Sequence, residues 1–139
     1  MLTSPRTKRF VTAVLILVNL GLGLICLTAL NRSREDARLA GCISNIRSIG
    51  LACAKYADSH NGMLPRKFDD LKEVSAPTEW FICPSAKNRA HYSYEFTGAT
   101  NIWGVSSNIV ILREIEPNHH GLRVVLYDNG HVALEHTQP

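Results

Sequence analysis

The feature that most constrains this chain is an uninterrupted apolar run over residues 10–30, FVTAVLILVNLGLGLICLTAL, which contains no charged side chain. In a helix that rises ~1.5 Å per residue, these residues extend about 31 Å, which matches the hydrocarbon thickness of a bilayer. The run is longer than the apolar region of a signal peptide, and Leu27-Thr28-Ala29 has Leu where a cleavage site needs a small residue. A lipoprotein anchor at Cys26 is disfavoured because Ile25 precedes it. We predict a retained transmembrane segment, and a secreted soluble domain cleaved near Ala29 is the alternative.

Charge on the two flanks of this run indicates its orientation. Arg6, Lys8 and Arg9 precede it, and positive charge on a short tail favours a cytoplasmic location for residues 1–9. The other flank carries three arginines and two acidic residues within residues 32–38, which weakens the asymmetry. We therefore expect a single span with the N-terminus in the cytoplasm and the C-terminal part exported.

Residues 31–58 continue the same helix as an amphipathic segment, because no proline or turn signal separates them from the apolar run. Apolar residues recur there every three or four positions, the spacing of one helix face. The sequence Asp58 to Gly62, followed by Pro65, is typical of a helix end with a left-handed cap. The predicted stripe comprises Leu39, Cys42, Ile43, Ile46, Ile49, Cys53, Tyr56 and Ala57.

Three of the four cysteines fall in the exported part, where disulfides form. Cys42 and Cys53 lie ~16 Å apart along one helix, too far to pair with each other, because a disulfide needs Cα atoms within about 7 Å. Both point towards the covering domain, so Cys83 can bridge to either of them. The candidate disulfide is Cys42–Cys83, and three reduced thiols are the alternative. Cys26 lies in the span as a small apolar residue.

Residues 59–139 form a small globular head in this prediction. A hairpin is indicated by the turn Asp128-Asn129-Gly130 between two apolar runs, and alternation indicates two earlier strands. The fold class is therefore α+β, a long N-terminal helix packed on a small C-terminal antiparallel sheet. The predicted elements are a short helix at 68–74, an irregular segment around Trp80, strands at 91–96, 108–114, 122–127 and 131–135, and a helix-facing set of Val124, Leu126, Val132 and Leu134.

Side chains of the types that bind metals or act in catalysis gather near the C-terminal end: His119, His120, Asp128, His131 and His136. The two ends of strand 122–127 are ~18 Å apart, so His119 and Asp128 are not expected to share a metal within the hairpin. We expect structural roles, with His131 bonded to Asp128, and we predict no enzyme, catalytic residue, metal, cofactor or small-molecule substrate. The net charge of +3 without a basic stripe also argues against nucleic acid.

The order of several short motifs resembles the pilin-like pseudopilins, in the branch whose members end in His, nine residues, then Asp-Gly. Cys42-x-x-Asn45 and Ile49-Gly50-Leu51-Ala52 resemble the helix after the membrane, and Cys83-Pro84 resembles a mid-domain Cys-Pro. The matching positions are Phe10, Asn45, Gly50, Pro65, His119, Asn129, Gly130 and His131, although Asn129 stands where the family has Asp. Asn serves the hairpin turn as well as Asp does. The resemblance implies a single-span helix, a periplasmic α+β head and assembly through helix bundling, as in type II secretion pseudopilins and type IV pilins.

The chain departs from that pattern at the prepilin cleavage site. Arg9 stands where the family has Gly, and Val14 stands where it has Glu, although Phe10 fits the aromatic first mature position. We therefore expect an unprocessed, pseudopilin-like structural protein of a bacterial inner membrane, with other pilin-like helices as partners. The alternative is a membrane-tethered periplasmic enzyme or metal-binding module that uses the His-rich hairpin.

Overall fold

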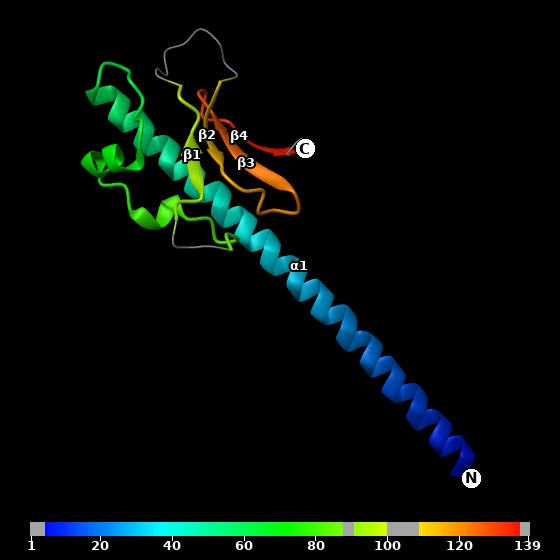
Figure 1. The fold of residues 1–139 in the computed structure, drawn as a ribbon. Helices are drawn as coiled ribbons and strands as arrows, with labels where there is room; N and C mark the ends of the chain where they lie inside the picture. Colours follow the sequence, from blue (N-terminus) through cyan, green and yellow to red (C-terminus); the bar gives the residue numbers. More distant parts are fainter. Residues whose placement is uncertain (1–4, 88–90, 100–108, 137–139) are drawn as a thin grey trace. The chain divides into compact units, whose positions relative to one another are not determined.

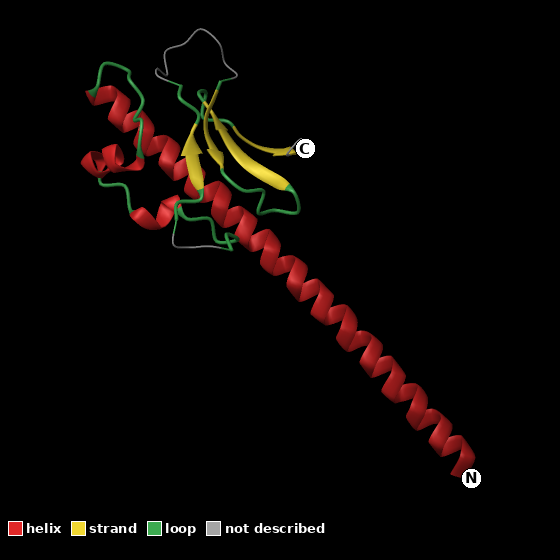
Figure 2. Cartoon of the chain, in the orientation of Figure 1, coloured by secondary structure: helices red, strands yellow, loops and turns green. Residues whose placement is uncertain are grey.

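The computed structural model describes residues 5–87, 91–99 and 109–136, and the chain forms one long helix, two short 3-10 helices and a four-stranded sheet (Figures 1 and 2). Residues 1–4 of the predicted tail and Asn108 at the start of a predicted strand lie outside the described residues. The elements are α1 (Pro5–Ser59), η1 (Phe68–Val74), η2 (Thr78–Phe81), β1 (Tyr94–Phe96), β2 (Val110–Glu114), β3 (Leu122–Tyr127) and β4 (Val132–His136).

The chain divides into a first unit, Met1–Asp36, and a head unit, Ala37–Pro139, and α1 begins in one and ends in the other. In the first unit the large apolar side chains of α1 are exposed; Phe10, for example, is 71% exposed. This part of α1 is long and apolar enough to span a membrane. The side-chain amide of Asn19 donates to Leu15 O at 2.7 Å and the hydroxyl of Thr28 donates to Ile25 O at 2.8 Å, so each side chain makes a hydrogen bond within the helix.

In the head unit, α1 buries the apolar stripe that its sequence predicts. Cys42, Ile46, Ile49, Cys53 and Ala57 are all at most 1% exposed, and they follow one another at helical spacing. Partly buried neighbours on the same stripe pack against the core: Leu39, Ile43 and Tyr56.

The end of α1 also follows the prediction. The helix ends at Ser59, and Asn61 and Gly62 then adopt positive φ angles of 54° and 81°. The backbone N–H of Gly62 donates to Ala57 O at 2.8 Å, which satisfies a carbonyl that the helix end would leave unpaired.

The segment between helix and sheet is more regular than predicted. Phe68 and Leu71 of η1 are buried as expected, but the region around Trp80 is a 3-10 turn, η2, instead of irregular chain. Phe68 contacts the rings of Phe81 and Phe96 at centroid distances of 4.6 and 4.8 Å. These aromatic contacts hold η1 and η2 against the core and the first strand.

The sheet is antiparallel throughout, with its strands in chain order β1-β2-β3-β4, and α1 packs against it (Figure 2). Strand β1 is shorter than the predicted 91–96, because the N–H of Ser93 donates to Phe81 O and so ties the chain to η2. In the hairpin, Val124 pairs with Leu134 and Leu126 with Val132.

The predicted helix-facing set is wrong at one position. Val124 and Leu126 are buried and Val132 packs on the core, but Leu134 is 40% exposed. A helix about 10 Å wide covers roughly two strands that lie ~4.8 Å apart. The edge strand β4 is therefore covered only in part, at Val132 and not at Leu134.

Gly50 sets how closely α1 approaches β3. A Cβ added at this glycine would lie 2.8 Å from Leu126 Cδ2, and Leu126 is itself buried. We therefore expect Gly50→Val to lower the free energy of unfolding by about 2 kcal/mol through overpacking. The measurement is denaturant unfolding of the full chain in detergent micelles. Ala54→Val, at an exposed position of the same helix, is the matched control, and equal losses for both variants would contradict the close-approach role.

Candidate functional site

Four side chains with metal-binding or redox chemistry meet in the core of the head unit. Cys42 comes from α1, Cys83 follows η2, Glu114 ends β2 and His119 precedes β3. Each is at most 3% exposed. One sulfur, nitrogen or oxygen atom from each of the four residues lies within 4.8 Å of the others. We refer to these residues as the core cluster.

Cys42 and Cys83 form a disulfide, with their Cα atoms 5.1 Å apart. This is the candidate pair named from the sequence, and the structure thus chooses Cys42 over Cys53. The Cys53 thiol stays free and buried, and burial raises its pKa to about 12. A thiol with so high a pKa holds little thiolate and is unreactive at neutral pH. Cys26 is free and exposed on α1.

Glu114 is a buried carboxyl with donors on both oxygens. Oε1 accepts from the side-chain amide of Asn118 at 2.9 Å, and Oε2 accepts from the backbone N–H of Val124 at 3.1 Å. Burial raises the pKa of Glu114, while these two donors and the charges of His119 and Arg123 act in the opposite direction. The carboxyl therefore joins the loop after β2 to strand β3 from inside the core.

His119 connects this carboxyl with the disulfide. Its Nε2 lies 3.4 Å from Cys83 Sγ and 3.7 Å from Glu114 Oε1. The next two residues, His120 and Gly121, have positive φ angles of 53° and 83°, and the N–H of Leu122 donates back to His119 O at 2.9 Å. This turn keeps His119 buried while the adjacent His120 is exposed.

The other candidates at the hairpin lie apart from the core cluster in the described structure. His131 and His136 are exposed. The backbone N–H of His131 donates to Asn129 Oδ1 at 2.8 Å, and its ring lies 5.9 Å from that of Tyr127. Asp128 donates its backbone N–H to Ile109 O, and its buried Oδ1 accepts no hydrogen bond in the described part of the chain. The expected His131–Asp128 bond is thus replaced by the contact with Asn129.

Three of the remaining motif positions, Asn45, Pro65 and Gly130, lie where they support the backbone. The amide of Asn45 donates to Ile82 O at 3.0 Å, which fastens α1 to the residue before Cys83. Pro65 is buried after the helix end, and Gly130 takes a φ of 79° in the hairpin turn.

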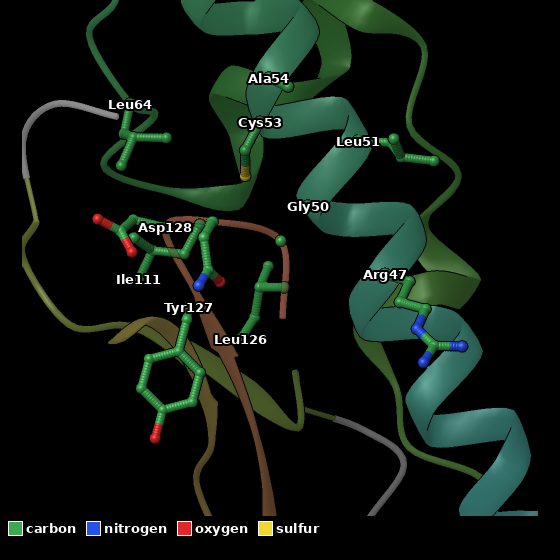
Figure 3. A pocket seen from close by; sticks show the side chains of 12 residues that line it. Arg47, Gly50, Leu51, Cys53, Ala54, Leu64, Ile111, Leu126, Tyr127 and Asp128 are labelled. Atoms are coloured by element: carbon green, nitrogen blue, oxygen red, sulfur yellow. The ribbon is translucent and has the colours of Figure 1, made fainter. Parts of the chain in front are cut away.

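A separate cavity of about 420 Å³ lies between α1 and the β3–β4 turn (Figure 3). Its lining is mainly apolar and includes Leu51, Leu64 and Leu126, with Arg47 at one side. The Cys53 sulfur points from α1 towards the hairpin in this view (Figure 3). The polar groups in its lining come from Arg47 on α1 and from Tyr127, Asp128 and Asn129 at the hairpin.

Sequence reasoning identified His119 and the cysteines but missed Glu114 and the convergence of all four side chains. The residues stand 41, 31 and five positions apart, which is unlike the short paired spacings of the common zinc motifs. The one available signal was an acidic residue at the end of a strand dense in apolar residues.

Comparison with protein-family models, curated proteins and solved structures gives no match for this chain.

The disulfide closes a large loop, because its cysteines are 41 positions apart in the sequence. The loop-closure entropy for this length corresponds to about 4 kcal/mol at 25 °C. We expect the double variant Cys42→Ala/Cys83→Ala to lose roughly 3–4 kcal/mol of unfolding free energy, measured by denaturant unfolding of the full chain in micelles. Cys26→Ala, at an exposed position of the first unit, should leave the midpoint unchanged. A double variant as stable as the parent would show that the cross-link contributes nothing.

Proposed function

We propose that this chain is a membrane-anchored structural protein of the pseudopilin-like class, without enzymatic activity. The observation that carries the proposal is the composition of α1. The same helix has exposed apolar side chains over residues 10–30 and, in the head unit, a stripe buried beneath an antiparallel sheet. The order of helix, mid-domain Cys-Pro and terminal hairpin supports the same class.

The exposed apolar surface of the first unit supports membrane insertion. Soluble proteins rarely expose a contiguous apolar patch larger than a few hundred Å², whereas residues 10–30 are exposed on every side of the helix. A lipid environment removes this surface from water, and the intrahelical hydrogen bond of Asn19 makes its amide tolerable there. Arg6, Lys8 and Arg9 favour a cytoplasmic N-terminus and an exported head.

Two residues support an unprocessed N-terminus. Arg9 occupies the position before the scissile bond, where prepilin peptidases require Gly, and Val14 replaces the family's Glu. A processed filament subunit would bury an N-terminal amine without that carboxylate, which costs several kcal/mol in lipid. The protein therefore acts at an inner membrane as an anchored partner of other pilin-like helices.

An enzyme or metal module built on the His-rich hairpin draws less support. Among the described residues, His119 joins the core cluster, while His120, His131 and His136 are exposed.

The test is production of the full chain in a Gram-negative bacterium that also makes a prepilin peptidase. We expect the protein in the inner-membrane fraction after alkaline carbonate extraction, because an inserted span resists extraction. A protease should degrade the head only after the outer membrane is opened, and the intact mass should include residues 1–9.

The matched variant is Arg9→Gly, which restores the residue that the peptidase requires. We expect this variant, and not the parent, to be shortened to a chain that begins at Phe10. A parent chain that begins at Phe10 with a methylated amine would refute the unprocessed state, and a soluble chain that begins near residue 30 would refute the anchor.

A further inference from the structure

We propose that the core cluster is a zinc site in the reduced chain, and that the Cys42–Cys83 disulfide and a Zn²⁺ ion are alternative occupants of one position. Reduction of the disulfide would leave two thiolates beside an imidazole and a carboxylate, all within the same buried space. Structural zinc is bound by four ligands drawn from Cys, His and carboxylate side chains. The thiolates favour Zn²⁺ over Mg²⁺ or Ca²⁺, which prefer oxygen ligands.

The distances in the cluster already approach those of a tetrahedral zinc site. With bonds of about 2.3 Å to sulfur and 2.0–2.1 Å to nitrogen or oxygen, ligand atoms lie about 3.8 Å (S–S), 3.6 Å (S–N) and 3.4 Å (N–O) apart. Cys83 Sγ and His119 Nε2 are 3.4 Å apart, and His119 Nε2 and Glu114 Oε1 are 3.7 Å apart. The largest change needed is the separation of the two sulfurs once their bond is broken.

Hydrogen bonds from neighbouring groups orient two of the four ligands, Cys83 and Glu114, and such outer partners are common at metal sites. The backbone N–H of Ser85 donates to Cys83 Sγ at 3.4 Å. Asn118 and Val124 fix the Glu114 carboxylate. Two thiolates, one carboxylate and Zn²⁺ sum to a charge of −1, which the nearby Arg123 partly offsets.

The site is closed because all four ligands come from the protein and each is buried. No position remains for a bound water or substrate, so the metal serves structure and not catalysis. The metal would join four segments: α1, the segment after η2, the end of β2 and the loop before β3. The disulfide joins only the first two of them.

The chain passes between the two states by a two-electron reduction or oxidation. A dithiol or phosphine reductant supplies two electrons, and two protons are taken up, so the S–S bond becomes two thiols. Binding of Zn²⁺ then releases both thiol protons to solvent as the Zn–S bonds form. A disulfide-donating oxidant reverses the process: it takes two electrons from the thiolates, and the metal leaves as the S–S bond forms. A newly exported chain that is still reduced would thus hold zinc before it is oxidised.

The test uses the full chain in detergent micelles, unfolded with a phosphine reductant and refolded with Zn²⁺ or Co²⁺. We expect one metal ion per reduced chain by elemental analysis and none in the oxidised chain. Co²⁺ should show a thiolate-to-metal charge-transfer band and the visible bands of a tetrahedral ion. Loss of an outer-shell partner costs about 10–100-fold in metal affinity, so Glu114→Gln and His119→Ala, which remove ligands, should cost at least about 100-fold.

Two kinds of control keep the test decisive. Cys53→Ala removes a buried thiol outside the cluster, and His131→Ala removes an exposed imidazole, so both should retain the metal. If His119→Ala fails to fold, His119→Cys restores a zinc ligand and should bind Co²⁺ with a stronger charge-transfer band. A reduced chain that binds no zinc, or equal binding by the oxidised chain or by Glu114→Gln, would overturn the proposal.

Discussion

The second half of α1 covers the inner face of the four-stranded sheet, and the core of the head unit lies between the helix and the sheet. Each buried Ile, Leu or Val at this boundary contributes about 1.5–3 kcal/mol, and the central contacts come from Ile46 and Ile49 on α1 and from Val124 and Leu126 on β3. This layer consists of a single helix, so the distance between α1 and the sheet has to be small. Gly50 allows that distance where α1 meets Leu126. The Cys42–Cys83 disulfide also holds the same helix to the segment after η2.

Much of this architecture could be predicted from local patterns. The stripe on α1 follows from the 3.6-residue period, its end from Gly62, and the hairpin from residues that tolerate positive φ at the turn. The predictions were wrong where contacts between distant segments determine the length of a strand or the exposure of a side chain. Strand β1 is short because Ser93 bonds to η2, and Leu134 is exposed because a single helix cannot cover the edge strand.

The candidate site was less predictable, for a physical reason. Cys42 and Cys53 share one face of α1, so the period of the helix could not show which of them meets Cys83. Glu114 was missed because a strand pattern gives the direction of a side chain relative to the sheet but not its partners beyond the sheet. The contact with His119 depends on the tight turn at His120 and Gly121, and the four side chains converge only when four separate segments pack together.

The position of the disulfide along the chain has a mechanical consequence. α1 enters the head unit at Ala37, and Cys42 follows within its first two turns. A pulling force that arrives along α1 therefore passes at Cys42 through the S–S bond to Cys83, and from there towards the sheet. Most of the buried stripe and both 3-10 helices lie within residues 43–82, inside the loop that the disulfide closes, so this tension cannot extend them. With the bond intact, tension on α1 cannot unwind the helix beneath the sheet, whereas in the dithiol form the same tension would act on that helix directly.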